Sequence, residues 1–339
     1  MRDGDVRALV VGFATAAAIL AVLFWVVGID EVAAALSRAE LDLVALAALL
    51  MVAWMVAWGI TLKIVLTVIG VEAGVLKAVL IYAAAGFANN VTPLGQAGGE
   101  PITALLIADV TDAEYETGLA AIASVDALNF IPSMTLALVG VAYYAINFDF
   151  GRRLEVLAAG VVGLAVVAVL LAALAWRYRY TLEERVVRAL GPVLRAVGRV
   201  VPRVTPPDPD DLADRVEGFF GAVERVATDR RSFLAALTFS TLGWLSQALA
   251  LWVAILALGV SIPVYVPLFV IPLGTTASVV PTPGGLGGIE TVHILLLTLA
   301  TGVTAPVATG AVTIHRIGGF FFVTGLGAGA AAFVRTWRR

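Results

Sequence analysis

Cysteine is absent from this chain of 339 residues, and Lys63 and Lys77 are its only lysines. Without cysteine the chain forms no disulfide and no thiolate metal site. Charged residues make up only 14% of the sequence, against about 25% in an ordinary soluble domain. The sequence also lacks the series of short alternating segments that is typical of a transmembrane β-barrel. These shortages argue against a soluble domain and against a barrel.

Apolar runs make up most of the sequence instead. Hydrophobic residues are 60% of the chain, the mean hydropathy is +0.97, and several runs reach roughly 18 residues, which predicts an all-α polytopic membrane protein. The first run is too long for the core of a signal peptide and no small-x-small cleavage site follows it, so we expect it to be retained. We expect six full spans, at residues 7–27, 42–62, 117–146, 154–176, 232–258 and 305–334.

Two copies of a glycine-rich motif interrupt the apolar runs. One copy runs from Thr92 to Glu100 and the other from Thr282 to Glu290, 190 positions later (282 − 92). At this offset Thr, Pro, two Gly and Glu coincide, at 92/282, 93/283, 95/285, 98/288 and 100/290. A helix break inside a membrane is costly unless it lines a cavity or is packed in protein. Matching breaks in two halves of a chain indicate a transporter-type site, whereas tight-packing glycine turns without a ligand are the alternative.

The segments around each motif predict re-entrant hairpins. Residues 77–90 would reach about 21 Å as a helix, too short for a hydrocarbon core of about 30 Å. We expect hairpins at 77–108 and 264–301, with Pro101 in the first turn of a returning helix. The basic middle segment and the basic C-terminus then both lie on the cytoplasmic side, as does the N-terminus. The two halves become inverted repeats, each a span, a hairpin and a span.

The predicted organisation has three parts. An N-terminal membrane half covers 1–176 with its motif at 89–101, and a C-terminal half covers 232–339 with its motif at 280–291. Between them, 177–231 is rich in arginine and predicts two cytoplasmic surface helices, at 181–200 and 209–228. A docking module is the alternative for this segment.

Glu100 and Glu290 are the first candidates for function, because an ionisable side chain within the membrane is a functional candidate by default. Each follows glycines and opens a helical leg, where free amides suit a phosphate. The carboxylate itself could bind a cation, a proton or a substrate amine, or it could cap the helix. The sequence leaves these roles open.

Arg316 lies about eleven residues into the last span, beside His315. A guanidinium at that depth needs a partner, and the candidates are Glu290, Glu100 and Asp126. The 190-residue offset pairs position 316 with Asp126. Arginine is suited to bidentate phosphate binding, although a purely structural ion pair would use the same residues. His293, three residues after Glu290, is expected to hydrogen-bond that carboxylate in preference to relaying protons.

The complete predicted substrate-binding set comprises these residues and their polar neighbours. It consists of Asn90, Thr92, Gly95, Gln96, Gly98, Gly99, Glu100, Asp126, Thr282, Gly284, Gly285, Gly288, Glu290, His293 and Arg316. The sequence contains no HExxH and no GxSxG motif, so we expect no catalytic residue, no metal and no cofactor.

The paired motifs and Arg316 resemble a known family. The chain is similar to the flippase-like membrane domain of lysylphosphatidylglycerol synthases, which also occurs as stand-alone proteins. The resemblance is carried in the first motif by Asn90-Val91-Thr92-Pro93 with Gly98-Gly99-Glu100, and in the second by Pro281 to Gly285 with Gly288 and Glu290. The resemblance covers nearly the whole chain and implies movement of a lipid with a charged or glycosylated headgroup between leaflets. In the synthases a soluble domain follows the membrane part, whereas this sequence stops at Arg339, so we expect no aminoacyl transfer and do not carry over the lysyl-lipid substrate.

Three functions therefore stay open at this point. The first is a lipid translocase of the cell membrane for a phosphate-bearing or glycosylated lipid, with both termini in the cytoplasm. The second is a membrane enzyme that processes a polyprenyl diphosphate. The third is a non-transporting partner of a glycosyltransferase or lipid synthase. No nucleic acid partner is expected, and the sequence leaves a homo-oligomer open.

Overall fold

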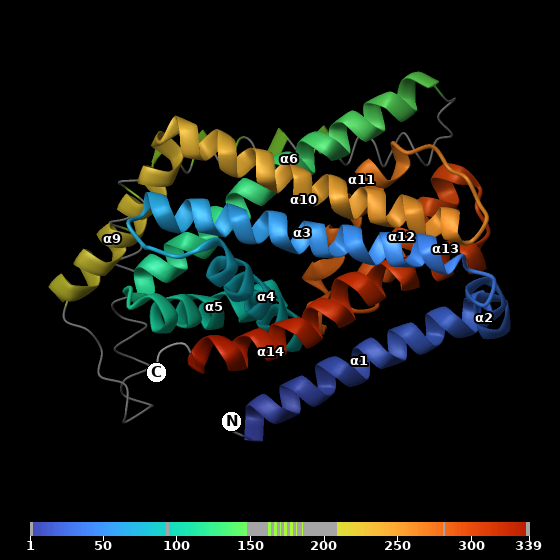
Figure 1. Cartoon of the computed structure of the whole chain (residues 1–339), viewed down its shortest axis with the longest axis horizontal. Helices are drawn as coiled ribbons and strands as arrows, with labels where there is room; N and C mark the ends of the chain where they lie inside the picture. Colours follow the sequence, from blue (N-terminus) through green and yellow to red (C-terminus); the bar gives the residue numbers. More distant parts are fainter. Residues whose placement is uncertain are drawn as a thin grey trace.

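The computed structural model describes residues 3–92, 95–147, 209–280 and 282–336, together with isolated positions between 162 and 185. All secondary structure in these ranges is helical (Figure 1), which confirms the predicted all-α class. The elements are α1 (Asp3–Val27), α2 (Ile29–Leu36), α3 (Leu41–Val68), α4 (Val75–Val91), α5 (Gln96–Thr111), α6 (Tyr115–Asn147), α9 (Pro209–Thr228), α10 (Arg230–Ala257), α11 (Val266–Thr275), η1 (Thr276–Val279), η2 (Pro283–Gly285), α12 (Gly288–Thr301), α13 (Ala305–Arg316), the π-helical η3 (Ile317–Phe322) and α14 (Val323–Thr336). The predicted span at 154–176 and the predicted helix at 181–200 lie outside the continuous described ranges.

Five of the described helical segments are long and apolar enough to cross a membrane. They are 41–68, 115–144, 230–257, 283–301 and 305–333, and a sixth forms if α1 and α2, bent by 85°, count as one span. Four of these match predicted spans. The segment 283–301 contains a 3₁₀ turn, and its α-helix, α12, has only 14 residues. This helix extends about 21 Å, as expected for the leg of a hairpin.

Local sequence accounts for several helix ends. Asp229 caps α10 because its carboxylate accepts a hydrogen bond from the Ser232 N–H at 3.3 Å. Hydrogen bonds from the side chain of Ser232 and from its N–H lower the pKa of the Asp229 carboxyl below its usual value. Helix α12 ends at Gly302, whose φ of +70° is left-handed and therefore suits glycine. The helix that follows, α13, has Pro306 in its first turn, where no intrahelical N–H is needed.

The first hairpin differs from its prediction at one leg. Helix α5 begins at Gln96, so Pro101 lies inside the helix and the predicted start at Pro101 is wrong. Gly99 explains the earlier start, because a Cβ at this position would lie 2.7 Å from the backbone of Asn89 on α4. Without side chains at 98 and 99, the helix can begin directly against α4. The returning leg therefore has 16 residues, twice the predicted eight of 101–108.

The helices of the two halves correspond at the 190-residue offset. Shifted by 190, the ranges of α3, α4, α5 and α6 become 231–258, 265–281, 286–301 and 305–337. The observed ranges are 230–257 for α10, 266–279 for α11 with η1, 288–301 for α12 and 305–336 for α13 to α14. The repeat seen in the motifs thus extends to the order and length of four helical segments.

Helix packing follows the same correspondence. The equivalent helices α3 and α10 lie side by side along the molecule (Figure 1). Helix α4 packs on α14 of the other half, and α11, the equivalent of α4, packs on α6. Each hairpin therefore contacts the final span of the opposite half. The interior between the halves is where both hairpins end.

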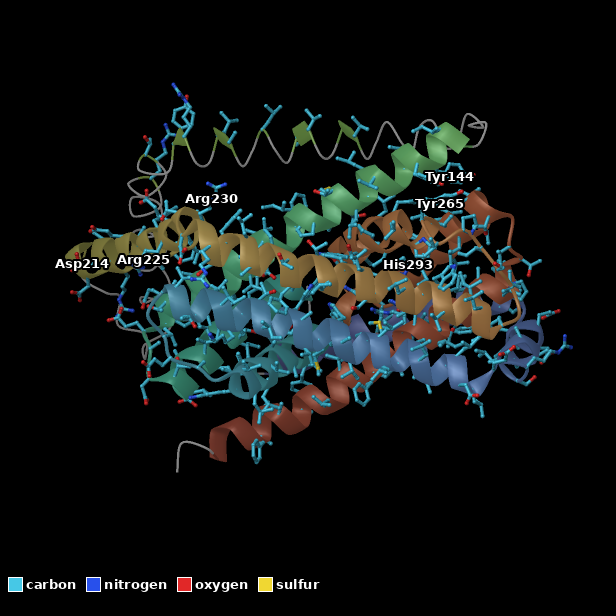
Figure 2. All side chains as sticks on the ribbon, turned by 45° about the horizontal axis from the view of Figure 1, so that its top comes forward. Tyr144, Asp214, Arg225, Arg230, Tyr265 and His293 are labelled. Carbon is cyan, nitrogen blue, oxygen red and sulfur yellow. The ribbon has the colours of Figure 1, made fainter. Side chains whose placement is uncertain are left out.

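The connections of the two hairpins lie at opposite ends of the molecule. The α3–α4 and α5–α6 connections lie at the end that also holds α9 and both termini, whereas the α10–α11 and α12–α13 connections lie at the end that holds α2 (Figure 1). Figure 2 shows Asp214, Arg225 and Arg230 at the first end, and Tyr144 with Tyr265 at the second. Both features fit the predicted topology. Inversion relative to a bilayer stays a prediction.

Candidate functional site

The two motifs meet at the tips of their hairpins. A Cβ on Gly95 would lie 3.9 Å from the backbone N of Gly284, so the turns are in direct contact. Gly95, Gly284, Gly285 and Gly287 all have φ between +54° and +86°. This backbone region is strained for residues with a side chain, which explains why both turns are built from glycine. Asn90 donates a hydrogen bond to Thr324 of α14 at 2.8 Å and holds the first tip against the other half.

A cavity of about 480 Å³ lies where the tips meet. Its volume falls within the range of about 300–1,000 Å³ that is usual for small-molecule sites. Eight predicted residues line it: Asn90, Gly95, Gln96, Glu100, Asp126, Gly284, Gly285 and Arg316. The structure thus brings residues of both halves, separated by up to 226 positions (316 − 90), to one cavity.

The cavity walls are themselves paired by the repeat. Nine pairs of its lining residues differ by 190 in number: 54/244, 82/272, 85/275, 86/276, 95/285, 126/316, 129/319, 130/320 and 133/323. Lining residues that were unrelated by the repeat would not form so many pairs at the single offset of 190 positions. The cavity therefore lies at the interface that relates the two halves, which is where transporters with repeated halves bind substrate.

Arg316 forms the basic wall of the cavity. Its Nε donates to Glu290 Oε1 at 2.5 Å and its Nη2 donates to the carbonyl of Gly284 at 3.2 Å. Its guanidinium also lies 4.9 Å from the centroid of the Phe320 ring. Of the three predicted partners, the structure selects Glu290. A guanidinium carries five N–H groups, so further donors remain for a group in the cavity.

Glu290 supports Arg316 from behind the cavity wall. Its side chain is only 8% exposed, and Oε2 accepts a hydrogen bond from the Gly287 N–H at 2.6 Å. The carboxylate therefore caps α12 with one oxygen and orients Arg316 with the other. Both roles that the sequence left open, capping and charge pairing, are carried by the same residue.

Glu100 and Asp126 form an acidic wall. Both carboxyls line the cavity close enough for their charges to interact, and Oδ1 of Asp126 accepts a hydrogen bond from Gln96 Nε2 at 3.0 Å. The buried Oδ2 of Asp126 has no hydrogen-bond donor among the described residues. The cavity thus presents a basic residue on α13 and two carboxyls on α5 and α6.

Aromatic residues, which the sequence analysis did not select, complete the walls. The ring of Trp58 on α3 lies 5.5 Å from Trp54, 6.0 Å from Tyr82 and 5.2 Å from Trp244, all edge to face. These four residues line the cavity. The signal for two of them was present in the sequence, because Trp54 and Trp244 coincide at the same 190-residue offset. Their apolar surroundings gave no other indication.

Seven predicted residues lie outside the cavity lining: Thr92, Gly98, Gly99, Thr282, Gly288, Glu290 and His293. The N–H groups of Gly98 and Gly99 both donate to the carbonyl of Gly95, so they serve the start of α5. The hydroxyl of Thr92 donates to the carbonyl of Ala88 at the end of α4, and that of Thr282 donates to the carbonyl of Leu286 in the second turn. Gly288 packs against Val280. These groups shape the turns.

His293 differs from its prediction. The hydrogen bond expected between His293 and Glu290 is not among the described contacts, and the oxygens of Glu290 accept from the Gly287 N–H and Arg316 Nε instead. The ring of His293 instead lies against α11, with Nε2 3.5 Å from the carbonyl of Ile271, and edge to face with His315 at 6.2 Å. Figure 2 shows His293 in the interior of the bundle.

Comparison with known proteins agrees with this architecture. The chain is 24% identical over 250 residues to a UPF0104 membrane protein of Methanothermobacter thermautotrophicus, covering 72% of this chain and 71% of the relative. It is 22% identical over 312 residues to a UPF0104 membrane protein of Pyrococcus horikoshii, covering 90% and 91%. The family model described as the lysylphosphatidylglycerol synthase TM region matches residues 9–327. Because this match includes both motifs, all the cavity walls and Arg316, the chain belongs to the family of the lysylphosphatidylglycerol synthase transmembrane region.

Proposed function

We propose that this multi-pass membrane protein moves a lipid with a phosphate-bearing headgroup between the leaflets of the cell membrane. The observation that carries the proposal is the cavity between the two hairpin tips, with Arg316 in its wall. The headgroup would enter the cavity while the acyl chains stay in lipid. A glycosylated phosphate lipid fits the same chemistry, because a sugar would stack on the tryptophans that line the cavity.

Arg316 is the group that we assign to the phosphate. Its guanidinium is fixed by Glu290 and the carbonyl of Gly284 and retains donors for a second anion. A planar fork held in this way suits two phosphate oxygens better than a flexible lysine would. The glycine amides of the first motif are bonded within α5, so the phosphate contact falls mainly on Arg316.

The proposal includes no covalent step and no cofactor. Delivery of the lipid would come from a lipid synthase or a glycosyltransferase in the same membrane, with its cytoplasmic contact on the arginine-rich segment 177–231. The N- and C-termini would lie on that cytoplasmic side.

Native mass spectrometry of the protein in lipid nanodiscs tests the proposal. We expect the wild type to retain one class of phosphate-bearing lipid, and Arg316→Gln to lose it. Arg215→Gln, which removes an exposed arginine paired with Glu116, is the matched control and should retain the lipid. Equal lipid retention by wild type and Arg316→Gln would refute the assignment.

Movement of the lipid needs a second measurement. Proteoliposomes with the lipid so identified, carrying a fluorescent label and quenched from outside, should show faster loss of protected signal with wild type than with Arg316→Gln. If the lipid is bound but does not cross, the protein is a lipid-binding partner and not a translocase. If inorganic phosphate is released from a lipid diphosphate, it is an enzyme.

A further inference from the structure

The ion pair Arg316–Glu290 has a counterpart in the other half. At the offset of 190, Glu290 corresponds to Glu100 and Arg316 corresponds to Asp126. The ion pair Arg316–Glu290 joins α13 to α12, and Asp126 of α6 and Glu100 of α5 line the same cavity, close enough for their charges to interact. The two sites therefore share their position in the fold and differ in the charge of a single residue.

The difference in charge has a direct physical consequence. In the second half, the guanidinium of Arg316 neutralises the hairpin glutamate. In the first half, Asp126 stands in the position of that arginine, so the hairpin glutamate faces a second carboxyl. Two ionised carboxylates in contact repel each other strongly in surroundings of low dielectric constant. Among the described residues, no cation stands beside Glu100 and Asp126 as the guanidinium stands beside Glu290, so a cation from solution would relieve this repulsion.

Two buried oxygens indicate where this cation would bind. Oδ2 of Asp126 and Oδ1 of Asn89 are buried and lack a hydrogen-bond partner among the described residues. The contact between Asp126 and Glu100 becomes a hydrogen bond only with a hydrogen between them, because an ionised carboxylate only accepts. Asn89 packs directly on Gly99, the residue before Glu100, and lines the same cavity as Glu100 and Asp126. A buried acceptor without a donor is costly.

The chemistry of the ligands narrows the occupant. All the groups available are oxygens, which suit a proton or a hard cation. The described residues contain no group of three or more His, Cys, Asp or Glu that could hold a metal ion, which argues against bound Ca²⁺, because Ca²⁺ takes about six to eight oxygen ligands. The other titratable or charged residues of the cavity are Tyr82 on α4, and His315 and Arg316 on α13. None of these is Glu100's ion-pair partner.

We propose that Glu100 and Asp126 form a site for an exchangeable monovalent cation, a proton or Na⁺, which replaces in the first half the guanidinium of Arg316 in the second. The site needs no bound lipid, although it would couple lipid movement to an ion gradient if the proposed function holds. Occupancy would remove one of the two negative charges of the acidic wall, and release would restore the repulsion between α5 and α6. The site is therefore distinct from the phosphate contact at Arg316.

Thermal unfolding of the full chain in nanodiscs, followed by tryptophan fluorescence, tests the site without lipid transport. The midpoint is measured against pH in sodium-free buffer, and against NaCl at fixed pH with tetramethylammonium chloride keeping the ionic strength constant. Ligands that bind the folded state raise the midpoint in a concentration-dependent way. We expect the wild-type midpoint to rise with acidification or with Na⁺, and Asp126→Asn and Glu100→Gln to lose that rise.

Asp126→Arg provides a sharper variant, because it builds into the first half the ion pair of the second. We expect its midpoint to be insensitive to the cation that stabilises the wild type. Glu116→Gln, ten residues earlier on the same helix and outside the cavity, is the control and should keep the wild-type response. A response to pH alone identifies a proton, and a response to Na⁺ at constant pH identifies the metal ion.

Two results would overturn the site. One is a wild-type midpoint that changes with neither acidification nor Na⁺, and the other is a change that persists undiminished in Asp126→Asn and Glu100→Gln. Should the position-126 variants fail to fold, the same comparison between wild type and Glu100→Gln decides. A cation response with no retained lipid would contradict the proposed function and leave the cation site standing.

Discussion

Removing one member of the buried pair Arg316–Glu290 should cost far more stability than removing one member of an exposed pair of the same geometry. The chain contains both: Arg316–Glu290 at 2.5 Å, with side chains 15% and 8% exposed, and Arg215–Glu116 at 2.5 Å, with side chains 55% and 17% exposed. Breaking a buried pair leaves an uncompensated charge and typically costs about 3–5 kcal/mol. An exposed pair contributes about 0–1 kcal/mol.

The partners of each residue predict how the variants differ. In Arg316→Gln, Glu290 keeps only the N–H of Gly287 for its charge. In Glu290→Gln, the guanidinium keeps only the carbonyl of Gly284 among its described hydrogen-bond partners. In the double variant both charges are gone and the two amides can pair. We therefore expect each single variant to lose about 3–5 kcal/mol, and the double variant to lose clearly less than the sum.

Thermal unfolding in nanodiscs measures these differences. With roughly 2 °C for each kcal/mol in a chain of this size, each buried single variant should unfold about 6–10 °C below wild type. Glu116→Gln should unfold within about 2 °C of it. Coupling in the double variant should reach about 0.5–3 kcal/mol. Additive losses, or equal losses for the buried and exposed pairs, would refute the view that Glu290 exists to hold Arg316.

The remaining predictions concern packing and topology. Gly327 of α14 packs directly on the backbone of Ala83 in α4, whereas Gly329 has open space around its Cα. Gly327→Ala should therefore lower the midpoint of thermal unfolding by several degrees, and Gly329→Ala should leave it unchanged or higher. A lower midpoint for Gly329→Ala alone would contradict the packing. Because the chain has no cysteine, Glu72→Cys in the α3–α4 loop and Ser261→Cys in the α10–α11 loop can be labelled singly in intact cells. A membrane-impermeant maleimide should reach Ser261→Cys and spare Glu72→Cys, and labelling of both from one face would exclude inverted hairpins.

The sequence predicted the helix breaks at the two motifs well because breaks are encoded by backbone chemistry. Glycine and proline change the permitted conformations locally, so the leg after the second motif was expected from Gly288 and begins there. For the first leg, Pro101 is a signal for a helix start, but α5 begins five residues earlier (101 − 96), at Gln96. A tertiary contact decided its position instead, since the backbone of Asn89 excludes any side chain at position 99.

Side-chain direction was much harder to predict than helix position. In a soluble helix, the apolar face points to the core, but a helix that is apolar all round gives no such orientation. Helix α3 is of this kind, and its Trp54 and Trp58 were therefore not assigned to the cavity. His293 shows the same difficulty. Its three-residue spacing from Glu290 permitted a hydrogen bond, but the ring turns toward Gly274, where the missing side chain leaves room for it.

Charge is where the two halves depart from their correspondence, and this departure bears on mechanism. If the two halves had identical hairpin sites, the two conformational states in which the halves exchange roles would have equal energy. Nothing would then couple the exchange to an ion. Here one hairpin glutamate has a permanent partner in Arg316, while the other faces Asp126. A ligand shifts a conformational equilibrium only by its differential affinity for the two states. Glu100 and Asp126 would hold a cation while α5 and α6 are in contact and release it when the two helices separate. This would supply the difference in affinity between the two states in the first half only.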